Sequence, residues 1–70
     1  MSYYAIQIIG YGKHQHFAVK QICENGLVLP VDGTRVCKSA ALAQAQAENI
    51  GIRIASIGDF YHIINASLSH

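Results

Sequence analysis

The segment AALAQAQAENI at residues 40–50 most constrains the fold, because its composition predicts a helix. Alanine has the highest helix propensity of the amino acids. Ser39 is expected to cap the N-terminus of this helix, and Gly51 is expected to follow its C-terminus in the left-handed conformation. Leu42 and Ala45 share one stripe of the helix, and its small side chains would let it lie close to a sheet.

Alternating apolar residues predict strands before and after this helix. The predicted strands are YYAIQIIGY (3–11), QHFAVKQIC (15–23), LVLPV (27–31), IRIASI (52–57) and FYHIIN (60–65). The last two would form a hairpin around Gly58-Asp59. The order β-β-β-α-β-β predicts an α+β fold, in which one helix packs on one face of an antiparallel sheet of four to five strands. We expect residues 1–70 to form a single domain.

Asn25-Gly26 is the strongest turn signal in the chain, because a type I′ hairpin requires positive φ at both central residues and these two residue types tolerate it. This turn would pair Cys23 with Val28. Pro30 cannot donate a backbone hydrogen bond, so the strand that contains it is expected to lie at a sheet edge or to end there.

The chain has more apolar residues than a single covered sheet face requires. Hydrophobic residues make up 51% of it and charged residues only 13%, about half the usual share of roughly 25%. We therefore expect a second apolar face to be buried in a homodimer or against a different protein. Aromatic and arginine side chains commonly anchor such interfaces. The predicted partner-binding residues are Tyr3, Tyr4, Arg53, Phe60 and Tyr61.

The candidate metal ligands are His14, His16, Cys23 and Cys37. His16 and Cys23 would lie at opposite ends of one strand, and at about 3.3 Å per residue they are too far apart to bind one ion. The sequence therefore predicts no metal site, and it indicates no cofactor. No nucleophile elbow or carboxylate pair accompanies either cysteine. We therefore predict a protein that is not an enzyme and has no catalytic residues.

An alternative function is that of a small nucleic-acid-binding regulator that uses its sheet face. Its cations would be Lys13, Lys20, Arg35, Lys38 and Arg53, and its stacking residues would be Tyr3, Tyr4 and Tyr61. The formal net charge of +1 supplies no strong field for attracting a polyanion.

The sequence also predicts where the protein is found. No basic leader precedes an apolar run at the N-terminus, and no run approaches the roughly 20 residues that span a bilayer. We therefore expect a cytoplasmic protein with no membrane contact, whose cysteines are free thiols.

The succession of YYAIQIIGY, the ENG turn, the AALAQAQAENIG helix and the IRIASIGDFYHIIN hairpin resembles the layout of small phage- and plasmid-borne accessory proteins. Several anti-CRISPR proteins are single α+β domains of this size. The resemblance implies a protein of a mobile element that works in the host cytoplasm. Such a protein inhibits a host protein or ribonucleoprotein complex by masking its surface, and the resemblance assigns no functional residue.

Self-association would bury the second face of the sheet. At about 25 cal/mol per Å², a few hundred Å² of apolar surface contributes several kcal/mol, comparable with the stability of a small domain. Replacing Phe60 or Tyr61 with a charged residue is therefore expected to shift the protein towards monomer or to weaken partner binding. Light scattering measures the first effect. A stable wild-type monomer at tens of micromolar would exclude the homodimer and leave the face to a different protein.

Overall fold

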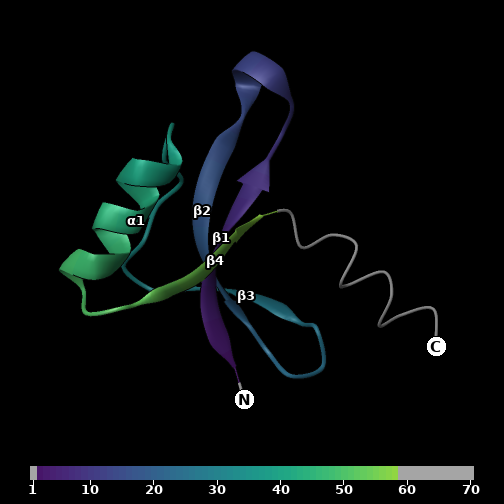
Figure 1. Ribbon diagram of the computed structural model, residues 1–70, viewed down its shortest axis with the longest axis vertical. Helices are drawn as coiled ribbons and strands as arrows, with labels where there is room; N and C mark the ends of the chain where they lie inside the picture. Colours follow the sequence, from purple (N-terminus) through teal and green to yellow (C-terminus); the bar gives the residue numbers. More distant parts are fainter. Residues whose placement is uncertain (1, 59–70) are drawn as a thin grey trace.

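The structure, a computed structural model, describes residues 2–58 (Figure 1). Its elements are β1 (Tyr3–Ile9), the 3₁₀ turn η1 (Gly12–His14), β2 (His16–Ile22), β3 (Val28–Pro30), α1 (Ala40–Asn49) and β4 (Ile54–Gly58). The strands form one sheet in the order β3-β2-β1-β4, and α1 packs on one face of it. The predicted α+β class, with one helix and four strands, is confirmed. The predicted strand at 60–65 lies outside the described residues, as does Asp59 of the turn before it.

The sheet is mixed rather than wholly antiparallel. β1 and β2 are antiparallel, as are β2 and β3, whereas β4 is parallel to β1. β3 and β4 therefore run in the same direction from opposite edges of the sheet, so the chain between them must cross the sheet. α1 makes this crossing and contacts β2, β1 and β4. The expected antiparallel arrangement differs at this one pair, because a helical connection lets the chain return parallel to its earlier direction.

α1 begins and ends where the sequence predicts. At its N-terminus, the Ser39 hydroxyl accepts a hydrogen bond from the Leu42 N–H at 3.2 Å. At its C-terminus, Gly51 adopts a φ of +81°, and its N–H donates to the Glu48 carbonyl at 3.0 Å. Both ends are therefore satisfied by the residues that the sequence places there.

The main core lies between α1 and the sheet. Ala43 and Ala47, one turn apart on α1, are fully buried and pack against Ile6 of β1 and Val19 of β2. Leu42 faces away from this core and is 59% exposed. The alanines rather than the leucine thus form the packed stripe of α1, and their short side chains bring the helix backbone close to the sheet.

A second apolar cluster involves the face of the sheet opposite α1. Ala5 and Ile22 are buried and pack with Val28. Tyr3 and Lys20 share this face, because they are the Cα partners of Ile22 and Ala5 and paired residues project to the same side. Apolar side chains therefore lie on both faces of the sheet, as the alternating pattern predicts.

The β2–β3 turn contains one residue more than predicted. Val28 pairs with Ile22 rather than with Cys23, so the predicted register is wrong by one position. A type I′ turn requires positive φ at Asn25 as well as at Gly26, but within residues 2–58 only glycines have positive φ. The Cys23 N–H donates to the Leu27 carbonyl at 2.8 Å, so the loop consists of three residues, 24–26, with Gly26 in the left-handed conformation at +83°.

The β1–β2 hairpin extends beyond the strands that flank it. β4 pairs with β1 only at Tyr4–Gln7, and β3 pairs with β2 only at Lys20–Ile22. A single bridge between Phe17 and Cys37 holds the loop before α1 against the base of the extension. Residues 9–16 are all exposed, and Figure 1 shows their turn projecting past α1.

Gly10 sets the geometry of this turn. Its φ is +88°, and a Cβ atom there would lie 2.7 Å from the carbonyl oxygen of His14. Gly10→Ala should therefore lower the free energy of unfolding by roughly 2 kcal/mol or more, because the left-handed conformation alone costs about 1–2 kcal/mol. Gly33→Ala is the matched control, since its φ is +82° and no atom lies within 4 Å of its added Cβ. Equal losses of stability in urea denaturation would contradict the steric argument.

Candidate functional site

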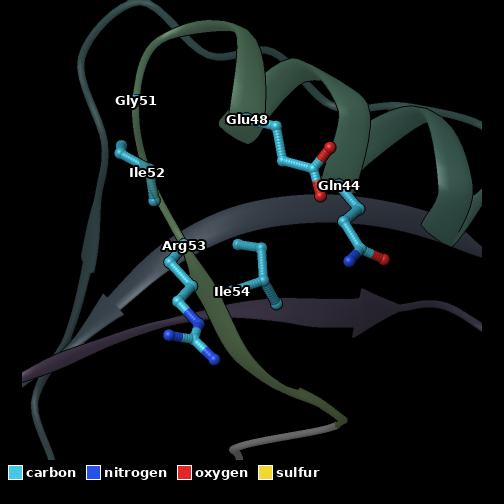
Figure 2. A pocket seen from close by; sticks show the side chains of 6 residues that line it. All are labelled: Gln44, Glu48, Gly51, Ile52, Arg53 and Ile54. Atoms are coloured by element: carbon cyan, nitrogen blue, oxygen red, sulfur yellow. The ribbon is translucent and has the colours of Figure 1, made fainter.

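A hollow of about 460 Å³ lies between α1 and the start of β4. Its lining residues are Gln44, Glu48, Gly51, Ile52, Arg53 and Ile54 (Figure 2). The hollow is thus built from the last turns of the helix, the glycine that ends it and the extended segment that leads into the edge of the sheet.

Each wall of the hollow follows from local structure. Gln44 and Glu48 are four residues apart and so lie on the same side of α1. Figure 2 shows their side chains on the part of α1 that lies above the Ile54 side chain. Ile52 and Ile54 are half-buried and pack against the core beneath α1. Arg53, between these two isoleucines in an extended segment, is exposed.

The lining of the hollow combines apolar side chains with two opposite charges. Glu48 and Arg53 supply one carboxylate and one guanidinium, and no ion pair joins them in the part of the chain that the structure describes. Gln44 adds an amide that can both donate and accept hydrogen bonds. The lining holds no serine, cysteine, histidine or lysine, and its ionisable groups are the Glu48 carboxylate and the Arg53 guanidinium.

Of the predicted partner-binding residues, Arg53 lines the hollow. Tyr4 is the Cα partner of Ile54, the residue that follows Arg53 in the chain. Tyr3 lies on the face opposite α1, where it is 38% exposed. Phe60 and Tyr61 lie outside the described residues.

Sequence analysis did not identify Gln44, Glu48 and Ile52 as site residues. The available signal was the predicted end of the helix at Gly51, with a polar pair four residues apart in the turns before it. That signal marks the rim of a site only when the strand after the glycine packs beside the helix, and this packing is a tertiary contact.

The candidate metal ligands do not converge. The bridge between Phe17 and Cys37 places Cys37 near the His16 end of β2, whereas Cys23 follows the other end of that strand. His14 lies in η1. Among residues 2–58, no group of three His, Cys, Asp or Glu side chains is arranged to hold a metal ion.

The cations of the alternative function are distributed over separate parts of the fold. Lys13 lies in η1, Lys20 on the face opposite α1, and Arg53 beside the hollow; Arg35 and Lys38 lie in the loop before α1. A sheet-face nucleic-acid site would therefore rest on Lys20 and Tyr3, and that function stays a prediction.

Comparisons with known proteins found no match among family models, curated proteins or solved structures. No helix within residues 2–58 is long and apolar enough to cross a membrane.

Gln46 ties the loop before α1 to the helix. Its side-chain oxygen accepts from the Arg35 N–H and its nitrogen donates to the Arg35 carbonyl, both at 2.9 Å. The same nitrogen lies 3.6 Å from the sulfur of Cys37. Cys37 is therefore a half-buried thiol at the edge of the core.

The two cysteines are predicted to be dispensable for folding. Cys23 lies six residues beyond Phe17, the partner of Cys37, which at about 3.3 Å per residue separates the cysteines by roughly 20 Å. A disulfide requires Cα atoms within about 7 Å. Replacing both cysteines with serine should therefore lower the free energy of unfolding by less than about 1.5 kcal/mol. A mass measurement after thiol alkylation that revealed an intramolecular disulfide would contradict this assignment.

Proposed function

We propose that this chain is a non-enzymatic protein-interaction module that binds a partner protein at the hollow between α1 and β4. The observation that supports it is the combination, in the lining of one hollow, of two half-buried isoleucines, Ile52 and Ile54, with an exposed carboxylate and an exposed guanidinium. Protein interfaces commonly have this composition, with apolar contacts at the centre and polar groups around them.

Exposed apolar residues extend the surface beyond the hollow. Ile50, at the end of α1, is 44% exposed, and Ile57, in β4, is 50% exposed. A standard interface buries about 800 Å² on each partner. That is about a sixth of the accessible surface of 5034 Å², more than the hollow alone can supply. A partner that also covers Ile50 and Ile57 fits this surface better than a small metabolite does.

The two charges would fix the orientation of the partner. Glu48 favours a cation and Arg53 favours a carboxylate, so a partner with the reversed pair in register is selected over one with like charges. Arginine can hold such a carboxylate with two parallel hydrogen bonds. The isoleucines would contribute affinity, and the charges would contribute specificity.

The resemblance to anti-CRISPR proteins supplies the class of partner. It implies a module of a mobile element that occludes a surface of a host complex. Occlusion requires affinity and position and no chemical step, so a binding surface is sufficient for it. A homodimer would present two such surfaces to the host complex.

The test is affinity capture from host lysate with charge-reversed baits. Arg53→Glu and Glu48→Lys should each reduce capture of the partner at least tenfold, since charge reversal places like charges opposite each other across the interface, which costs several kcal/mol. Both residues are exposed, so the variants should fold as the wild type does.

Lys38→Glu is the matched control, because Lys38 is an exposed cation in the loop before α1 and away from the lining of the hollow. It should capture the partner as well as the wild type does. Undiminished capture by both hollow variants would contradict the proposal.

A further inference from the structure

The β1–β2 hairpin differs from the rest of the chain in its charge. Residues 2–23 contain two lysines and two histidines but no aspartate or glutamate. All four carboxylate side chains of the protein follow at positions 24–70, where three lysines and arginines accompany them. The overall charge of +1 is thus the sum of a positive charge on the hairpin and a small negative charge on the rest of the chain. The total charge alone does not reveal this asymmetry.

The turn of this hairpin presents an aromatic ring to solvent. Tyr11 is 91% exposed. It lies between Gly10 and Gly12, both with positive φ, and its carbonyl accepts a hydrogen bond from the His14 N–H at 3.0 Å. The backbone that carries the ring is therefore held by a tight turn, so little conformational entropy is lost when the ring makes contact.

The residues around Tyr11 are polar and cationic. Lys13, His14 and His16 are all exposed, and Gln15 adds an amide between the histidines. Aromatic anchors of protein interfaces are usually surrounded by residues that exclude water. The neighbours of Tyr11 along this turn are glycines and charged or polar side chains, an environment that suits a ligand that is itself charged and hydrated.

We propose that the tip of the β1–β2 hairpin binds single-stranded nucleic acid, with a base stacked on Tyr11 and a phosphate contacted by Lys13. Base stacking on aromatic side chains tolerates any sequence, and cations beside the ring follow the backbone. The hairpin carries no carboxylate that would repel the phosphates. His14 and His16 offer ring N–H groups to neighbouring phosphates or base edges.

This site is independent of the hollow between α1 and β4. The tip is formed by the far ends of β1 and β2, and it shares no residue with the lining of the hollow. It also differs from a sheet-face nucleic-acid site, because the ligand would contact the projecting turn. One lysine and one ring predict sequence-independent binding, with a dissociation constant within the range of about 10⁻⁴–10⁻⁶ M typical of non-specific complexes.

Fluorescence anisotropy with labelled oligo(dT) and oligo(rU) of about 12 nucleotides tests the proposal. Tyr11→Ala should weaken binding by about 5- to 100-fold, the loss expected when one stacked base is removed. Tyr11→Phe keeps the ring and should bind as the wild type does. Lys13→Gln should reduce the slope of log affinity against log salt by about 0.7, the value for one phosphate contact on a single strand.

Lys38→Gln is the control for this slope, because it removes a cation outside the hairpin and should leave the slope nearly unchanged. Equal affinity for a duplex of the same length would overturn the proposal, since a paired base cannot stack on Tyr11. Unchanged oligonucleotide binding by Tyr11→Ala would overturn it as well. The proposal would also be overturned if the wild-type protein bound no oligonucleotide and Tyr11→Ala abolished capture of the protein partner. That result would assign the tip to a protein.

Discussion

The contact of Ala43 and Ala47 with Ile6 and Val19 is the interaction on which the rest of the structure depends. The methyl side chains of the buried stripe bring α1 close to β1 and β2. The direction in which the helix crosses the sheet then determines where β4 begins. Because alanine buries little area, this contact gives a small chain only a modest margin of stability. Gln44 and Glu48 lie outside this buried stripe, and the packing places them in the lining of the hollow together with Ile54 of β4 (Figure 2).

The unequal lengths of the strands have a second consequence. β1 and β2 each contain seven residues, whereas β4 contains five and β3 three, so neither flanking strand supports the far end of the hairpin. An unsupported two-stranded ribbon is marginally stable by itself. Here the antiparallel pairing continues through Ile9 and His16, and the tight turn at Gly10 closes it. A small domain can thus present an ordered turn well away from its core.

The sequence predicted those features that local chemistry controls. Ser39 and Gly51 delimit α1 because a capping hydroxyl and a left-handed glycine act within one turn of the helix. The turn after β2 differs from the predicted type I′ turn because Asn25 tolerates positive φ without requiring it, and only Gly26 has positive φ in this turn. The direction of β4, and with it the proximity of Tyr4 to Ile54, depends on the crossing of α1 over the sheet. The alternation of apolar and polar residues is the same whether β4 runs parallel or antiparallel to β1. The position of the hollow could therefore not be predicted from the sequence.

The two proposed sites lie at opposite ends of β1. Tyr4 pairs with Ile54 beside the hollow, and Ile9 ends the strand below the turn that carries Tyr11. At about 3.3 Å per residue, the five positions between Tyr4 and Ile9 separate them by roughly 17 Å. A ribonucleoprotein complex can present a protein surface and a single strand at this spacing, whereas a free protein or a free nucleic acid can occupy only one site. When one complex engages both sites, the first contact raises the effective concentration for the second contact. The complex is then bound more tightly than either site alone would bind it.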